Sequence, residues 1–250
     1  AGIDRFPETW EEFWECCDTL KEHGITPLAL HTEGTGWAPM LIATAALAES
    51  KEGAEFMRQM LPESYENESG LYLGEVQKLF SYTTDDALHS DYDVAYSNFF
   101  SDKAAMIPNG YWLIDQIPEN RGDEIRFSSF PEHTLVASPE TFGWAVVSSY
   151  PDEVKAAAVE FLKFRTEYNK NEKDTLFNQD LTDKPQVLKD YLKAFSGADQ
   201  IVPNYQVKWN SILQEETLGV ALPLLAEQKI TPEKFVQMVQ ESVLEFKAEQ

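Results

Sequence analysis

The stretch Phe99–Trp112 constrains the fold of this chain more than any other part of the sequence. Its centre, Ala104–Ile107, is a short apolar run bounded by polar and turn-forming residues, which is typical of a buried strand. Residues 108–110, Pro-Asn-Gly, then predict a turn, because Asn and Gly accept backbone angles that most residues avoid. The sequence therefore places Tyr111 and Trp112 just beyond the carboxyl end of a strand.

In open α/β sheets, ligands bind at this end of the strands. The indole of Trp112 offers a flat face on which a ligand can stack, and Asn109 offers a hydrogen-bond donor and an acceptor close by. We therefore expect Trp112 to be the main stacking surface of a binding site, with Asn109 as a hydrogen-bonding group and Tyr111 as a weaker candidate.

A second loop with binding chemistry, residues 31–37 (His-Thr-Glu-Gly-Thr-Gly-Trp), follows the apolar stretch Ile25–Leu30, an expected edge or first strand. Its two glycines let the backbone approach a ligand closely, while Glu33 can accept hydrogen bonds from hydroxyl groups and Trp37 can stack. The alternative is an ordinary connection from a strand to a helix, with Trp37 in the core, because core aromatics outnumber binding ones. The sequence is compatible with both.

Hydrophobic periodicity predicts a chain dominated by helices. Thr9 is a good N-cap, Glu12 completes a capping box, and Gly24 ends that first helix. Thr231 caps the last helix, with Pro232 at its first position. Other helices are expected at residues 39–48, 50–61, 71–82, 92–100, 152–168, 184–195 and 209–226, with a break at 169–174, and other strands at 125–130 and 143–148.

Charge and composition exclude several classes of partner. The chain has 250 residues, of which 43% are hydrophobic, enough for a substantial core in one or two domains. Its 43 acidic residues outnumber its 20 basic ones, and a net charge of −23 repels phosphate backbones, so no nucleic-acid partner is expected. The same charge disfavours an anionic ligand. The longest apolar run, Pro39–Ala48, is too short to span a membrane.

Nothing in the sequence specifies catalysis, a cofactor or a metal. The motifs for a serine nucleophile, a phosphate-binding loop, a zinc protease and a dinucleotide site are missing, and the histidines are scattered. Sequence spacing alone does not test a glycosidase-like pair of carboxylates. The acids at 85, 86, 91 and 93 with His89 fit neither a calcium loop nor a zinc motif, and an acidic helix start explains them better.

The two cysteines, Cys16 and Cys17, are adjacent on a predicted helix, where their side chains diverge by about 100°. They are poorly placed to bridge each other, so no disulfide is expected. Cys17 is predicted to be a small buried residue and Cys16 a half-exposed thiol.

Three segments follow motifs of one protein family. Residues 99–112 resemble the F-x-x-G-K-A-A-M-x-x-N-G-x-W signature of the maltose-binding-protein-like family, the extracellular solute-binding proteins that serve sugar ABC importers. Pro7–Phe13 resembles that family's P-x-T-W-x-E-F, and Gly143-Trp144 with the helix Ala156–Phe164 resembles its later G-W…A-x-x-F-L-x-F block. Asp102 stands where the family usually has Gly. If that Gly adopts a positive φ, Asp can follow at modest cost, because Asp tolerates this region better than most residues.

The resemblance implies an α/β fold of the periplasmic-binding-protein type II architecture. The likeness matches the later part of a family member, so residues 1–130 and 203–250 would form the second, carboxyl-terminal lobe, and residues 131–202 an incomplete part of the first lobe. We expect this incomplete part to have an uncovered apolar helix face, to be poorly packed or rearranged, and to promote self-association. An incomplete first lobe also implies weaker sugar binding than a complete two-lobed protein would have.

The implied function is capture of a mono- or oligosaccharide for delivery to the membrane permease subunits of an ABC importer. The implied location is extracellular or on the cell surface through a lipoprotein anchor, or periplasmic in a Gram-negative source. The resemblance adds Trp144, Trp209 and Glu215 as further cleft contacts. The alternatives are a non-sugar solute (a peptide, a uronic acid or an amino sugar) and a helix-rich domain that binds another protein.

Overall fold

The computed structural model describes residues 1–34, 36–58, 76–137, 144–204 and 213–248. Its strands form two small parallel sheets, each made from segments far apart in the sequence. β1 (Thr26–Leu28) pairs with β2 (Ala104–Met106), and β3 (Thr134–Val136) pairs with β4 (Gln200–Val202). The strands predicted around Ile25–Leu30 and Ala104–Ile107 are therefore confirmed, and the structure makes them parallel neighbours. Parallel pairing brings the ends of β1 and β2 to the same edge, where the two predicted binding loops begin.

The first helix, α1 (Trp10–Glu22), begins and ends as its sequence predicts. Thr9 Oγ1 accepts a hydrogen bond from the Glu12 backbone N–H at 3.2 Å, which caps one of the free amides of the first turn. The Glu12 carboxylate accepts from the backbone N–H of Glu8 at 2.8 Å, and hydrogen bonds with the backbones of Glu8 and Thr9 help to lower its pKa. Gly24 has a φ of +72°, as a residue that ends a helix in the left-handed region should.

The remaining helices agree broadly with the periodicity. The segments that interrupt them include short 3₁₀ turns, among them η3 (Tyr111–Gln116), which follows the predicted turn after β2. The other long helices are α2 (Trp37–Leu47), α3 (Lys51–Arg58), α5 (Tyr92–Phe100), α7 (Gln186–Ser196), α8 (Gly219–Ala226) and α9 (Pro232–Ala248). The short ones are η1 (Phe80–Tyr82), η2 (Ala87–His89), η4 (Glu119–Arg121) and the π-helical η7 (Leu213–Leu218). Of the helix expected at 71–82, only its end lies within the described residues.

Helix α2 is the centre of the core. It is apolar on all sides, as expected for a helix with no solvent-facing side. Met40 and Leu47 pack with α8 and α9 in one cluster of buried side chains, whereas Ala38 and Ile42 pack with α1 and β1 in another. The free cysteines follow the prediction, because Cys17 is buried and Cys16 is partly exposed. Burial raises the pKa of the Cys17 thiol to about 12.

Three local predictions are wrong. Residues 125–129 are irregular, and only Phe130 makes a single bridge, to Thr134. The strand expected at 143–148 does not form at residues 144–147, where the apolar pattern has no paired strand to complete its hydrogen bonds. The break expected at 169–174 is absent, because α6 (Asp152–Asn178) continues through this polar segment, which contains neither Gly nor Pro.

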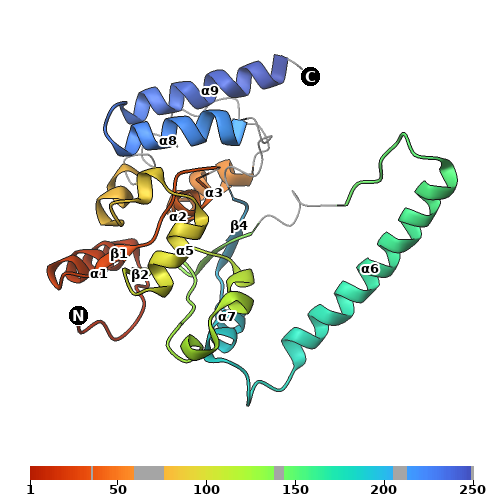
Figure 1. The fold of residues 1–250 in the computed structure, drawn as a ribbon, viewed down its shortest axis with the longest axis horizontal. Helices are drawn as coiled ribbons and strands as arrows, with labels where there is room; N and C mark the ends of the chain where they lie inside the picture. The colour runs from red at the N-terminus through yellow and green to blue at the C-terminus, as the bar shows by residue number, and fades with distance from the viewer. Residues whose placement is uncertain (35, 59–75, 138–143, 205–212, 249–250) are drawn as a thin grey trace.

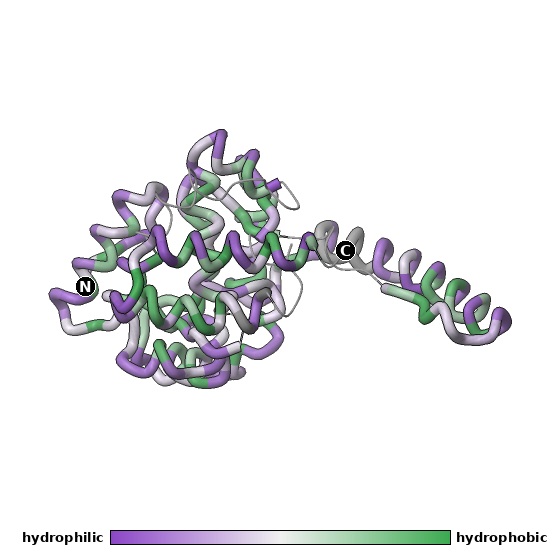
Figure 2. The backbone as a smooth tube through the Cα atoms, turned by 90° about the horizontal axis from the view of Figure 1, so that it is seen from above, coloured by the Kyte–Doolittle hydropathy of each residue, from purple (hydrophilic) through white to green (hydrophobic). Residues whose placement is uncertain are grey.

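Helix α6 extends away from the rest of the molecule (Figure 1). Its 27 residues make it about 40 Å long. In the view from above it again projects beyond the body, with hydrophobic positions along it (Figure 2). Val154, Phe161, Phe164 and Tyr168 recur at helical spacing and are all exposed. The expectation of an uncovered apolar helix face within residues 131–202 is therefore confirmed.

Asp102 has a φ of +61°, so this Asp does adopt a positive backbone angle where the family usually has Gly. Arg121 holds this residue from the neighbouring turn, with Nη2 donating to Asp102 Oδ1 at 2.7 Å. Among the described residues, no helix is both long enough and apolar enough to cross a membrane.

Candidate binding site

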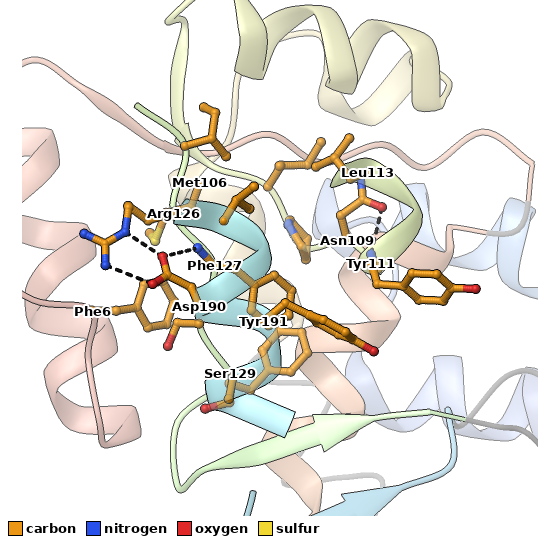
Figure 3. Close-up of a pocket in the computed structure, with 18 of the residues that line it drawn as sticks. Phe6, Met106, Asn109, Tyr111, Leu113, Arg126, Phe127, Ser129, Asp190 and Tyr191 are labelled. Carbon is orange, nitrogen blue, oxygen red and sulfur yellow. Dashed lines mark hydrogen bonds and ion pairs between the residues drawn. The ribbon is translucent and has the colours of Figure 1, made fainter. Parts of the chain in front are cut away.

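A broad, mainly apolar groove opens where the chain leaves β2, and the residues from β2 to η3 line it together with one face of α7. Figure 3 shows a close-up of its lining. Three of the predicted site residues, Asn109, Tyr111 and Trp112, line this groove side by side. The structure thus brings the predicted strand-end residues to a concave surface.

Trp112 is 46% exposed, and its indole lies directly over Gly110. A Cβ added at Gly110 would come within 2.1 Å of Trp112 Cζ3 and 2.2 Å of Cη2. The φ of Gly110 is −107°, an angle that any residue can adopt. Gly110 is therefore needed because any side chain at this position would collide with the indole. The prediction that the turn needs this glycine for its backbone angle is wrong.

Trp112 is supported by an aromatic side chain of another element, Trp37 on α2. The Trp37 ring meets it edge-on, with 6.0 Å between the centroids. Trp37 in turn contacts Tyr92 at the start of α5, with 5.5 Å between centroids, and His31 at 5.4 Å. Trp37 is partly buried against the core and lies outside the groove lining, as its core interpretation expects, and it reaches the groove only through its contact with Trp112.

Asn109 is held in place by two hydrogen bonds. Its Nδ2 donates to the Tyr92 hydroxyl at 3.1 Å, and its Oδ1 accepts from the backbone N–H of Gly110 at 2.8 Å. An amide has two N–H groups and two lone pairs on oxygen, so each end has the capacity for one more bond. Burial raises the pKa of the Tyr92 phenol, so that group remains a neutral partner.

Helix α7 provides the opposite wall, which sequence reasoning missed. Tyr191 lies 5.9 Å from Tyr111 between ring centroids, and Phe127 meets Tyr191 edge-on at 5.3 Å (Figure 3). Tyr111 is 60% exposed. The available signal was the apolar spacing of Val187, Tyr191 and Phe195, which marks one face of α7.

Each arginine that lines the groove is paired with a carboxylate. Arg126 donates from Nε and Nη2 to the two carboxylate oxygens of Asp190, at 2.5 and 3.1 Å (Figure 3). Burial opposes ionisation of Asp190, but the hydrogen bonds from Arg126 and Gln186 outweigh it and hold its pKa below the ordinary value. Asp190 is therefore an anion neutralised by a fork-shaped cation.

Two further arginines line the groove, and both are bound by carboxylates. Arg5 contacts Glu12 at 2.6 Å. Arg121 contacts Asp102 at 2.7 Å and Glu124 at 2.5 Å. The carboxylates thus offset the charge of all three lining arginines, and Lys193 is a further cation of the lining.

The other predicted site residues lie elsewhere. Glu33 is exposed in the loop after β1, where its backbone N–H donates to Ser90 O at 3.0 Å. Trp144 is 72% exposed and is outside the groove lining. Glu215 is exposed on η7, and Trp209 lies outside the described residues. Within the described part of the chain, no three His, Cys, Asp or Glu side chains converge as metal ligands would.

The small parallel sheets between helices and the groove at the strand ends define an α/β binding protein. Solved structures confirm the fold. A "Chitin oligosaccharide binding protein" superposes with a TM-score of 0.80 at 20% identity, over 98% of this chain and 66% of that one. A solute-binding protein from Streptococcus pneumoniae, in complex with the blood group A-trisaccharide, gives 0.71 at 16% identity, over 96% and 65%.

A third structure, from work on xylan utilization by Caldanaerobius polysaccharolyticus, gives a TM-score of 0.69 at 16% identity, over 95% of this chain and 66% of that one. This chain therefore spans slightly less than two thirds of the length of each of these proteins. No curated protein matches the sequence.

The description "Bacterial extracellular solute-binding protein" belongs to the family whose model matches residues 1–167. The chain belongs to this family, and its fold is that of a partial type II binding protein. The expected resemblance is confirmed.

Proposed function

We propose that this extracellular solute-binding protein captures a neutral mono- or oligosaccharide in the groove between η3 and α7. The observation that carries the proposal is the half-exposed indole of Trp112 beside Asn109. A sugar ring has an apolar C–H face that stacks on an indole and a rim of hydroxyl groups that suits an amide.

The groove supports a ligand with more than one contact surface. Tyr111 and Tyr191 extend the aromatic lining away from Trp112 toward Phe127. We assign Trp112 the main stacking role and Asn109 a hydrogen-bonding role, and we propose Tyr111 and Tyr191 as further stacking surfaces. Trp37 acts through Trp112. The role of Glu33 remains a proposal from the chemistry of its loop, and the roles of Trp144, Trp209 and Glu215 remain proposals from the family resemblance.

Charge favours a neutral sugar over a uronic acid or another anion. The net charge of −23 repels anions, and the arginines of the groove are already bound by carboxylates. A carboxylate ligand would have to displace Asp190 from Arg126 to find a bidentate partner. Direct binding titrations with an amino sugar, a peptide and a neutral sugar distinguish these alternatives.

The wider function follows from the family. We propose that residues 1–130 and 203–250 form the second lobe, that residues 131–202 belong to the first lobe, and that the bound sugar is delivered to the permease subunits of an ABC importer. We also propose a lipoprotein anchor and no enzymatic role. The exposed apolar face of α6 supports self-association of this chain through residues 131–202.

Titration calorimetry tests the proposal with a chitin oligosaccharide, a xylo-oligosaccharide, galactose and the A-trisaccharide. We expect at least one of these to bind, and Trp112→Ala to weaken it at least about tenfold, which corresponds to about 1.4 kcal/mol. Trp14→Ala is the matched control, because Trp14 packs against Phe13 and Tyr82 and is outside the groove lining. Equal losses in both variants, or no binding of any sugar, would contradict the proposal.

A further inference from the structure

His31 lies behind the aromatic side chains of the proposed site and is only 2% exposed. Its Nδ1 is 3.4 Å from the carbonyl oxygen of Glu33, so in the neutral tautomer that fits, Nδ1–H donates to this carbonyl. Its Nε2 is fully buried and, among the described residues, has no hydrogen-bond partner. An unpaired buried nitrogen costs free energy, which a phenylalanine ring of similar width would not.

The imidazole contacts the two residues that support the ligand-facing groups. It meets Trp37 edge-on at 5.4 Å and an interplanar angle of 68°, and Tyr92 at 6.1 Å and 76°. Trp37 supports the indole of Trp112, and the Tyr92 hydroxyl accepts from Asn109. The two groove residues Trp112 and Asn109 are therefore each held by a side chain that contacts His31.

We propose that His31 is a positioning residue of the sugar site, whose neutral imidazole holds Trp37 and Tyr92 in the orientations that present Trp112 and Asn109 to the groove. This inference rests on the proposed function, because it concerns the affinity of that same site. His31 itself is sealed from the groove and does not touch the ligand.

Protonation of His31 disturbs this arrangement. A second N–H on the ring would have no acceptor, and its charge would be enclosed by the rings of Trp37 and Tyr92. Burial lowers the pKa of His31, while the Glu33 carbonyl and the Asp91 carboxylate at the start of α5 oppose that shift. Among the described residues, the titratable groups that interact with the ring are Asp91, the N-cap of α5, and Tyr92 on α5, whereas Glu33 contributes its backbone carbonyl and α2 the uncharged Trp37.

The test compares His31→Ala and His31→Phe with the unmodified chain at pH 7.5 and along a series down to pH 5. Near-ultraviolet circular dichroism and acrylamide quenching of tryptophan fluorescence report the ring packing without any ligand, and calorimetry with a chitin oligosaccharide reports affinity. Leu225→Ala is the matched control for stability, because Leu225 is fully buried in the core cluster around α8 and α9.

At pH 7.5 we expect His31→Ala to weaken sugar binding about tenfold and to increase quenching, because it removes two edge-on ring contacts. His31→Phe should stay within about threefold of the unmodified chain, since it keeps a ring in the same place. As the pH falls, the unmodified chain should lose near-ultraviolet signal and affinity below the ordinary histidine pKa of about 6.5, whereas His31→Phe should not.

The proposal is overturned if His31→Ala keeps the ring packing and affinity of the unmodified chain, if Leu225→Ala weakens sugar binding equally, or if His31→Phe shows the same pH profile. Should His31→Ala fail to fold, the pH profile of His31→Phe still decides. If the unmodified chain binds no sugar, the proposed function fails, and the two ligand-free measurements still decide the role of His31.

Discussion

Replacing Gly110 by Ala is expected to displace the indole of Trp112. The new methyl group would lie 2.1–2.5 Å from three carbons of the six-membered ring, whereas carbon atoms in contact stay about 3.5–4.0 Å apart. The ring must therefore move by more than about 1 Å or the turn must change. Since Gly110 has an ordinary φ of −107°, the backbone itself does not resist the substitution.

The size of the effect follows from these contacts. Overpacking typically costs about 1–3 kcal/mol, and losing the edge-on contact between Trp37 and Trp112 costs about 0.5–1.5 kcal/mol. Replacing Gly by Ala gains about 0.4–1 kcal/mol by restricting the unfolded chain. We therefore expect Gly110→Ala to lower the free energy of unfolding by about 0.5–4 kcal/mol and to weaken sugar binding at least about tenfold.

A double-mutant cycle isolates the cause. Urea unfolding is measured for Gly110→Ala with Trp112 present and in a Trp112→Ala background, where we expect the substitution to become neutral or stabilising. Gly122→Ala is the matched control, because its φ is −58° and an added Cβ would come no closer than 3.8 Å to Glu119 O. Equal costs of Gly110→Ala in both backgrounds would refute the steric argument.

Other substitutions test separate features of the chain. Asp102→Gly should be neutral or mildly stabilising, because the φ of Asp102 is +61° and its exposed ion pair with Arg121 contributes little. Asp102→Val should be clearly destabilising, because a β-branched residue resists this φ. Equal melting temperatures of the Gly and Val variants would contradict this prediction. The lowered pKa of Asp190 contributes stability above its unfolded-state pKa of about 3.9, and this stability is lost as the pH falls through the folded pKa. Asp190→Asn should therefore lower the free energy of unfolding at pH 7, as measured by urea unfolding, and should reduce the loss of that free energy as the pH falls. An unchanged slope of unfolding free energy against pH below pH 4 would exclude this role. Phe161→Glu combined with Phe164→Glu should reduce concentration-dependent association in analytical ultracentrifugation, and a monomeric unmodified chain would contradict that prediction.

Local sequence signals determined the helix ends and the strand beside the groove. Thr9 and Gly24 act through bonds and angles within a few residues, so their effects do not depend on the rest of the fold. The same holds for Asp102 and for the apolar run that forms β2. The half-exposed state of Trp112 also followed from its place after a strand.

Only the tertiary structure decided which side chains meet. Tyr92, Tyr191 and His31 come from three elements far apart in the sequence, and no periodicity relates their positions to Trp112. The role of Gly110 depends on where an indole two residues away is placed by Trp37, which no local angle reveals. The apolar pattern at 143–148 formed no strand at its described residues, because a strand needs a neighbour to complete its hydrogen bonds and sequence pattern alone does not supply one.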